Sequence, residues 1–92
     1  MRYERKSAFE RAARRLPPDR KERVKAAVGQ IVVFFETGEL PQGLGLKRLR
    51  GNFWEARAGF GVCIIFRISG DLVEFAIVGN HDEIARFLRQ NT

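Results

Sequence analysis

The chain of 92 residues has one cysteine, Cys63, and one histidine, His81. A single cysteine excludes an internal disulfide, and the two residues together are too few nitrogen and sulfur ligands for a zinc site in one chain. The longest apolar run, residues 31–35, is far shorter than the ~20 residues that span a bilayer. The N-terminus lacks the apolar segment of a secretory signal. We therefore expect a cytoplasmic protein that uses no metal, no cofactor and no membrane.

The composition limits both the architecture and the partners. Hydrophobic residues make up 45% of the chain, with eight Phe, which is enough for one core and gives no sign of disorder. We expect a single domain over residues 1–92. Seventeen Lys and Arg against eleven Asp and Glu give a formal charge of +6. Such a charge favours nucleic acid, an acidic protein or an anionic membrane surface as partner, although a solvated basic surface is the simpler alternative.

Apolar residues spaced by three and four predict a helix over residues 7–16 and a second over residues 18–36, with Pro17 and Pro18 between them. A connection this short predicts an antiparallel helical hairpin. The hairpin is followed by one long loop, residues 37–52, which contains five glycines and prolines in total and a basic cluster.

Three strands are predicted after this loop, over residues 53–58, 60–69 and 72–78, with a hairpin turn at 69–71. Asn80 and Glu83 then have the spacing of a capping box, which starts a short final helix. The predicted fold is α+β. The helical hairpin packs on one face of a small antiparallel sheet of three to four strands, with residues 1–5 as a weakly indicated edge strand.

Alternation along the strands predicts which residues share the face opposite the hairpin. Cys63 and Arg67 fall on this face in the middle strand, and Arg57 falls on it in the strand before. The loop that leads into this sheet adds Lys47, Arg48 and Arg50. Guanidinium groups on an open sheet surface match phosphodiester oxygens, so a phosphate-binding groove is one interpretation. Arginines that merely occupy the wet face of a half-covered sheet are the other.

His81 lies where the last strand ends and the final helix begins. Free backbone N–H groups at a helix N-terminus favour a bound anion, and a histidine there could act as a base or proton shuttle. RNA cleavage needs a base for the 2′-hydroxyl, cations for the phosphorane and an acid for the leaving oxygen, and no metal. A surface histidine beside a helix cap is the alternative. Cys63 has no evident partner that would make it a nucleophile.

Three segments of the sequence resemble the RelE/ParE superfamily of bacterial type II toxins. They are L-x-G-x-x-W-E-x-R at 49–57, V-x-I-I-F-R-I at 62–68 and the corner at 79–81, in that order after a helical hairpin. The resemblance covers nearly the whole chain. It implies a toxin that is a metal-independent endoribonuclease, cleaves mRNA on the ribosome to inhibit translation, and is neutralised by a cognate antitoxin protein.

The resemblance also implies roles for individual residues. Family members draw catalytic groups from the loop and strand over residues 47–57, from the middle strand, and from the sheet end before the final helix, which His81 occupies here. Within these segments we expect Lys47, Arg57 and Arg67 to contact the phosphate and the transition state, and His81 to act as acid or base. Further contacts to RNA would come from Arg48, Arg50, Cys63 and Phe87. Phe87 stands where some relatives have a tyrosine, so it can stack on a base but cannot transfer a proton.

Cys63 is the main departure from the family pattern, because relatives usually have an arginine there. Losing one cation from an electrostatic site costs on the order of ~3 kcal/mol, or about 10²-fold in rate. Three accounts stay open: Arg67 replaces the missing cation, the protein is a weakened enzyme, or it is an attenuated variant of a toxic parent. Two other functions also stay open, a ParE-like inhibitor of DNA gyrase that acts without catalysis and a member that only binds RNA or antitoxin.

Overall fold

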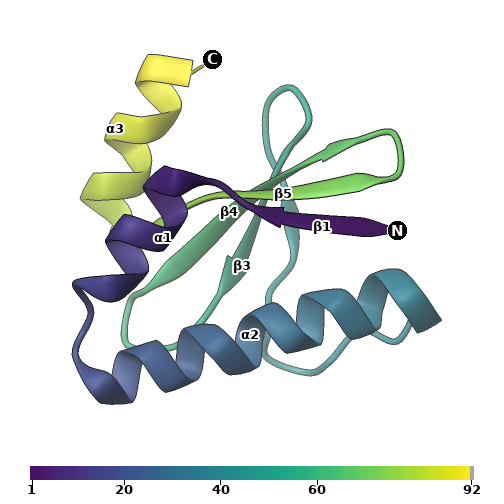
Figure 1. Ribbon diagram of the computed structural model, residues 1–92, viewed down its shortest axis with the longest axis horizontal. Coiled ribbons are helices and arrows are strands. Elements are labelled where there is room, and N and C mark those ends of the chain that lie inside the picture. The colour runs from purple at the N-terminus through teal and green to yellow at the C-terminus, as the bar shows by residue number, and fades with distance from the viewer. Residues whose placement is uncertain (92) are drawn as a thin grey trace.

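A mixed sheet forms the centre of the computed structural model, which describes residues 1–91 (Figure 1). Within these residues the sheet has five strands in the order β1-β5-β4-β3-β2, and three helices cover it. The elements in chain order are β1 (Arg2–Arg5), α1 (Ser7–Arg14), α2 (Pro18–Thr37), β2 (Lys47–Arg48), β3 (Phe53–Arg57), β4 (Cys63–Ser69), β5 (Leu72–Gly79) and α3 (His81–Asn91). The predicted α+β class and the order of the main elements are confirmed.

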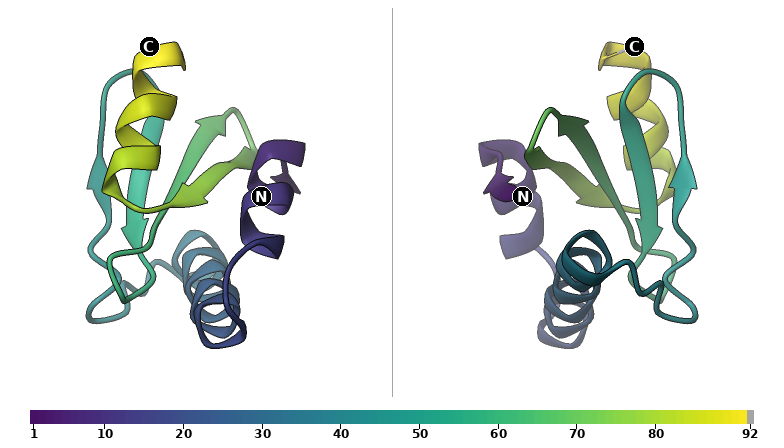
Figure 2. Two further views of the ribbon diagram at one scale, coloured as in Figure 1. Left: turned by 90° about the vertical axis from the view of Figure 1, so that its left-hand side faces the viewer. Right: turned by 90° about the vertical axis from the view of Figure 1, so that its right-hand side faces the viewer.

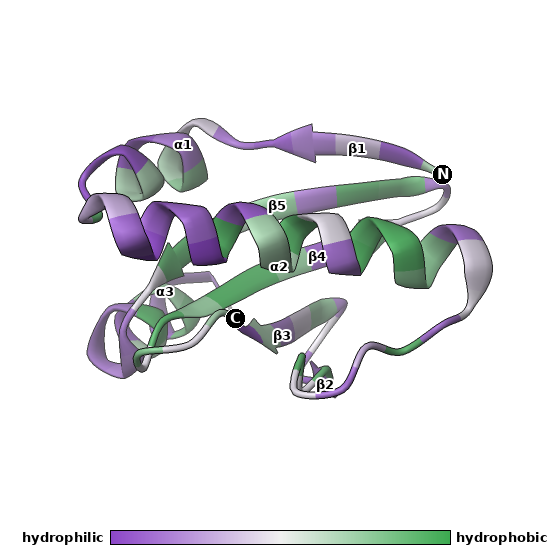
Figure 3. Ribbon diagram, turned by 90° about the horizontal axis from the view of Figure 1, so that it is seen from below, coloured by the Kyte–Doolittle hydropathy of each residue, from purple (hydrophilic) through white to green (hydrophobic). Residues whose placement is uncertain are grey.

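Helices α1 and α2 cover one face of the sheet and form the main core with it. Phe9 of α1 packs on Phe75 of β5, with ring centroids 5.7 Å apart, and Ile31 of α2 is fully buried. The apolar part of α2 lies toward its C-terminal end, whereas its first turns are charged (Figure 3). Gly38 ends α2 with a φ of 79°, a left-handed conformation that glycine adopts without steric cost. None of the helices in the described part of the chain is long and apolar enough to cross a membrane.

Helix α3 lies on the opposite face of the sheet (Figure 2). The expectation that the face opposite the helical hairpin is open is therefore wrong. Ile84 of α3 is buried against Phe53, Cys63 and Ile65, which are themselves 7%, 3% and 0% exposed. The reason is that this face is too apolar at its centre to remain in water, and the apolar side of α3 covers it.

The sheet is larger than predicted and not purely antiparallel. β1 pairs in parallel with β5, so a strand from the N-terminus of the chain forms one edge of the sheet. The short β2, inside the segment predicted as one long loop, pairs with β3, so that Lys47 lies opposite Glu55. Both added strands are short and largely exposed, which is why alternation signalled them weakly.

A β-bulge interrupts the pairing of β4 with β5. Ile65 pairs with Ile77 while the next residue, Phe66, pairs with Phe75, so Ala76 has no partner of its own. The extra residue shifts the register beyond it, and Cys63 pairs with Gly79 instead of Val78. The bulge thus decides which residues of β5 reach the end of the sheet where α3 begins.

Candidate functional site

A cavity of about 220 Å³ opens at the end of the sheet where β3 ends and β4 and α3 begin. Arg57 is the last residue of β3, Cys63 is the first of β4, and the two are paired across the strands. His81, the first residue of α3, lies on the third side. The remaining lining residues are small or apolar: Gly43, Gly59, Gly61 and Val62. The structure therefore brings together one cation, one thiol and the imidazole.

The predicted capping box fixes the position of His81. The backbone N–H of Glu83 donates to Oδ1 of Asn80 at 2.9 Å, and the N–H of Asn80 donates to Oε1 of Glu83 at 2.8 Å. Gly79 makes room for this carboxylate, because a Cβ atom there would lie 2.7 Å from Oε1 of Glu83. The helix start is rigid in consequence, and the exposed His81 is held at the mouth of the cavity.

Arg57 is held by the loop before β2. Its backbone N–H donates to the carbonyl oxygen of Leu44 at 2.7 Å, and Leu44 anchors the loop because it is 1% exposed. The guanidinium lies against Gly45, where a Cβ atom would be 2.7 Å from Cζ of Arg57. Within residues 1–91 no carboxylate forms an ion pair with Arg57. Its charge is thus available to an anion in the cavity.

Cys63 forms part of the cavity wall and is a neutral thiol. Burial is the main cause that raises its pKa, the nearby Glu55 raises it further, and Arg57 acts in the opposite direction. A thiol held protonated in this way is a poor nucleophile. Cys63 therefore lines the cavity together with Arg57 and His81 without adding a charge.

Arg67 lies at the other end of the same face. It lies four positions after Cys63 in β4, about 13 Å along an extended strand. Its Nε and Nη2 atoms donate to Oε1 of Glu74 at 3.1 and 2.9 Å, and Lys6 Nζ is 3.5 Å from the other oxygen of Glu74. These contacts lower the pKa of Glu74, with the hydrogen bond from Arg67 as the largest cause. The structure does not bring Arg67 to His81.

Phe87 belongs to this second end of the face as well. Its ring packs edge-on against Phe53 with centroids 5.8 Å apart, and the guanidinium of Arg67 lies 5.8 Å from the centre of the Phe53 ring. Phe87 and Arg67 line a separate hollow of about 230 Å³ beside Glu74. Phe87 is half-buried there, and it does not line the cavity that contains His81.

The basic loop residues lie outside the cavity. Lys47 shares the face of Arg57, because it pairs with Glu55, whereas Arg48 pairs with Trp54 and points to the opposite face. Arg50 is exposed in the turn that follows β2. Of the three, only Lys47 is placed where an extended ligand in the cavity would pass.

Arg23 is a neighbour of the site that the sequence did not indicate. Together with Gln30 of the same helix and Gln42, it lines a hollow of about 250 Å³ that also contains Arg57. Gly43 and Gly59 line both this hollow and the cavity of His81, so the two lie side by side. The first turns of α2 gave only the signal of a charged, exposed helix.

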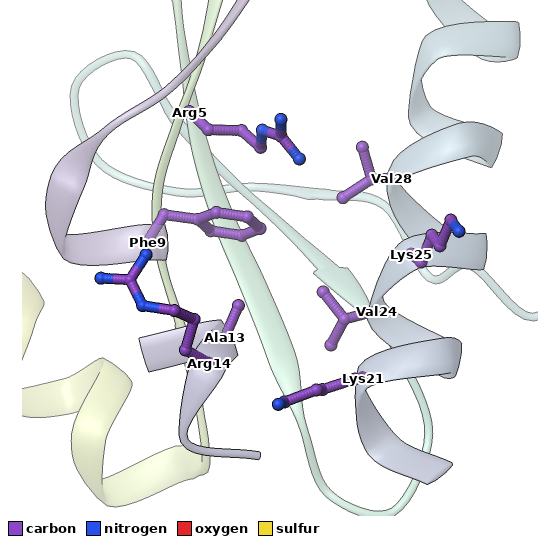
Figure 4. Close-up of a pocket in the computed structure, with 8 residues that line it drawn as sticks. All are labelled: Arg5, Phe9, Ala13, Arg14, Lys21, Val24, Lys25 and Val28. Atoms are coloured by element: carbon purple, nitrogen blue, oxygen red, sulfur yellow. The ribbon is translucent and has the colours of Figure 1, made fainter. Parts of the chain in front are cut away.

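A further cavity of about 300 Å³ lies between α1 and α2 (Figure 4). Figure 4 shows the ring of Phe9 and the side chain of Val24 facing one another across it. Four basic side chains line it as well: Arg5, Arg14, Lys21 and Lys25. It is apolar inside and positively charged at its edges.

Within residues 1–91 no three His, Cys, Asp or Glu side chains are grouped in a way that could hold a metal ion. The chemistry available in the cavity of His81 is that of an imidazole beside a guanidinium. Such a pair can bind a phosphate and move a proton to or from it.

This arrangement of sheet and helices is the fold of the RelE/ParE-like toxins. The chain matches RelE in the RelB–RelE antitoxin–toxin complex of Methanococcus jannaschii, with a TM-score of 0.67, 19% identity and coverage of 95% of this chain and 98% of the other. It matches YafQ in the Escherichia coli DinJ–YafQ complex with a TM-score of 0.73, 16% identity and coverage of 91% and 98%.

A third similar structure is the YoeB/ParE toxin of Agrobacterium tumefaciens, with a TM-score of 0.66, 17% identity and coverage of 88% and 99%. No family model and no curated protein matches the sequence. The likeness in three dimensions over nearly the full length of both chains confirms the RelE/ParE-like fold that the sequence motifs predicted.

Proposed function

We propose that this chain is the toxin of a type II toxin–antitoxin pair and that it cleaves mRNA as a metal-independent endoribonuclease. The observation that supports this best is the cavity that His81 and Arg57 line together with the neutral Cys63. Relatives of similar fold are toxins bound to antitoxins, such as RelE with RelB. The net charge of +6 favours RNA as the substrate.

In the proposed mechanism the scissile phosphate lies against Arg57. His81 takes the proton of the adjacent 2′-hydroxyl, and the oxygen attacks phosphorus as the bond to the 5′-oxygen breaks. Arg57 stabilises the negative charge that builds up on the phosphate oxygens, and water protonates the leaving oxygen. The products are a 2′,3′-cyclic phosphate and a free 5′-hydroxyl. Lys47 is proposed to contact a neighbouring phosphate of the RNA from the same face.

Arg67 has no part in the proposed cleavage step. Because its guanidinium is hydrogen-bonded to Glu74 about 13 Å along the strand from Cys63, it is not the replacement for the cation that relatives have at position 63. Of the three accounts of Cys63, the geometry favours a weakened enzyme, in which Arg57 alone contacts the charge that develops during cleavage.

An acidic antitoxin segment is the proposed protein partner. Its binding site would be the cavity between α1 and α2, where apolar side chains can accept hydrophobic residues and the four basic residues can attract carboxylates (Figure 4). A segment that folds as it binds would gain both burial and electrostatic attraction there.

The proposal is tested by His81→Ala in an RNA cleavage assay. We expect the cleavage rate to fall by about 10²-fold or more, because general acid–base groups contribute at least that much. Arg89→Ala, which removes an exposed cation at the far end of α3, is the control and should cleave as the wild type does. Equal rates for His81→Ala and wild type would remove His81 from the mechanism. If no variant cleaves RNA and the wild type inhibits supercoiling by gyrase, the ParE-like function is the correct one.

A further inference from the structure

Phe60 has a backbone conformation that its side chain does not favour. Its φ is 54°, in the left-handed region, where non-glycine residues are strained. It lies between Gly59 and Gly61, in a tight loop closed by the hydrogen bonds Ala58 N–H to Val62 oxygen and Val62 N–H to Gly59 oxygen, both 2.9 Å. The residue is 57% exposed, so burial does not offset the strain. Glycine would satisfy this loop better, and a functional reason for the phenylalanine is needed.

Two arginines of α2 lie beside this exposed ring. The guanidinium carbon of Arg23 is 4.6 Å from the ring centre and that of Arg20 is 4.8 Å. Arg23 also packs on the loop backbone, since a Cβ atom at Gly59 would be 3.1 Å from its Cδ atom. Cation–π contacts hold both side chains near the ring. Arg20 Nη1 also lies 3.3 Å from Oδ2 of Asp19, whereas no carboxylate within residues 1–91 forms an ion pair with Arg23, so Arg23 is the cation available to a ligand.

This group is adjacent to the proposed active site. Arg23 and Arg57 line the same hollow, and Gly59, which precedes Phe60, lines both that hollow and the cavity of His81. Arg23 therefore connects the hollow that it shares with Arg57 to the exposed ring of Phe60. Proteins that bind single-stranded nucleic acid combine these two features, cations along the backbone and aromatic rings on which bases stack.

We propose that Phe60, Arg20 and Arg23 bind a nucleotide of single-stranded RNA next to the scissile bond. The base stacks on Phe60, Arg20 packs on the same ring, and Arg23 contacts the phosphate that leads away from Arg57. A double helix keeps its bases stacked on one another, so the site selects unpaired RNA. This inference rests on the proposed function for its substrate, and it adds a binding site on the loop 59–61 and the first turns of α2.

The test measures RNA binding separately from cleavage. Fluorescence anisotropy with a short, fluorescein-labelled single-stranded RNA of mixed sequence is recorded for His81→Ala protein and for the same protein carrying a second change. Phe60→Gly is expected to weaken binding about tenfold, because one stacked base is lost. Phe60→Trp should bind at least as well as the parent. Leu40→Ala is the matched control, since Leu40 is a loop residue 59% exposed, and it should change nothing.

Thermal unfolding separates a binding role from a structural one. Phe60→Gly relieves the strained conformation, so its melting temperature should equal or exceed that of the parent while its RNA affinity falls. Arg23→Ala removes one proposed phosphate contact. The slope of log affinity against log salt concentration should therefore decrease in magnitude by about one.

Unchanged RNA affinity in Phe60→Gly would overturn the inference, and so would an equal loss of affinity in Phe60→Trp. Phe60→Gly should not weaken binding to a duplex of the same sequence, because a duplex offers no free base. A loss of duplex affinity as large as the loss of single-strand affinity would also overturn the inference. These results do not depend on cleavage. If His81→Ala cleaves as the wild type does, the mechanism fails, and the same binding comparison is made with a 2′-O-methyl RNA, which has no 2′-hydroxyl to attack phosphorus and so stays intact.

Discussion

The sheet face that α3 covers has one arginine at each end, and the two arginines differ in their contacts with carboxylates. At one end Arg57 has no carboxylate partner within residues 1–91 and lines a cavity with Cys63 and His81. At the other end Arg67 is hydrogen-bonded to Glu74, which is only 8% exposed and also contacts Lys6. Both arginines lie on strands next to each other and on the same face.

Under the proposed function, this difference separates structural from functional charge within one sheet. A guanidinium whose donors are occupied by a carboxylate stabilises the fold and has little capacity left for a ligand. A guanidinium held only by backbone contacts contributes little to stability and keeps its charge for an incoming phosphate. Binding and catalysis are therefore expected at the Arg57 end and stability at the Arg67 end.

The largest expected change comes from adding a cation at the Arg57 end. Cys63→Arg should raise the rate of RNA cleavage by about 10²-fold, since one more cation stabilises the developing charge on the phosphate. The side chain starts at the cavity wall and can extend into the cavity, although replacing a buried residue will also lower the stability. Cleavage by purified protein, with growth arrest on expression as a second readout, measures the effect. Cys63→Ser is the control, and an unchanged rate in Cys63→Arg would show that the missing cation does not limit the enzyme.

A smaller effect is expected from removing the carboxylate at the Arg67 end. Glu74→Gln should lower the free energy of unfolding by about 1 kcal/mol, a modest value because the Arg67 side chain is nearly half exposed. The pKa of Glu74 is lowered in the folded protein, so its contribution is present above the ordinary pKa of glutamate and lost as the pH falls through the lowered value.

Urea unfolding at neutral and acidic pH measures this contribution. The difference between wild type and Glu74→Gln should disappear at acidic pH. Asp71→Asn, which breaks an exposed ion pair with Arg2, is the control and should have a smaller effect. A constant difference across the pH range would contradict the role of the carboxylate.

The smallest effect concerns a carboxylate contact away from both ends. The hydroxyl of Tyr3 donates to Oε2 of Glu36 at 2.7 Å, and burial together with this contact raises the pKa of Tyr3 to about 12. The associated stability is present below the ordinary pKa and lost as the pH rises through about 12. Tyr3 is the only tyrosine, so tyrosinate absorbance during an alkaline titration reports on it alone. Glu36→Gln should keep the part of the shift that burial causes, and a midpoint at the ordinary value in wild type would show that the contact does not form.

Local sequence signals predicted much of this fold. Apolar spacing located α1 and α2, alternation located β3 and β4, and the Asn80–Glu83 spacing located the start of α3. A two-residue turn at 70–71 also places Ser69 opposite Leu72 and therefore Arg67 opposite Glu74, so the ion pair follows from the sequence once the turn is located.

Two features of the site could not be predicted from local patterns. The bulge at Ala76 moves Gly79 opposite Cys63, and no turn or glycine in β5 signals where an extra residue falls. The face that α3 covers depends on burial across several strands and not on the helix itself. Both features decide where His81 lies relative to Arg57, so the site needed the three-dimensional structure.

A matched pair of variants tests the central claim most directly: Arg57→Ala and Arg67→Ala, each measured for RNA cleavage and for urea unfolding. Arg57→Ala should lose about 10²-fold in cleavage rate with an unchanged free energy of unfolding. Arg67→Ala should keep a rate close to that of wild type and lose about 1 kcal/mol of stability. A larger loss of cleavage in Arg67→Ala than in Arg57→Ala would contradict the account.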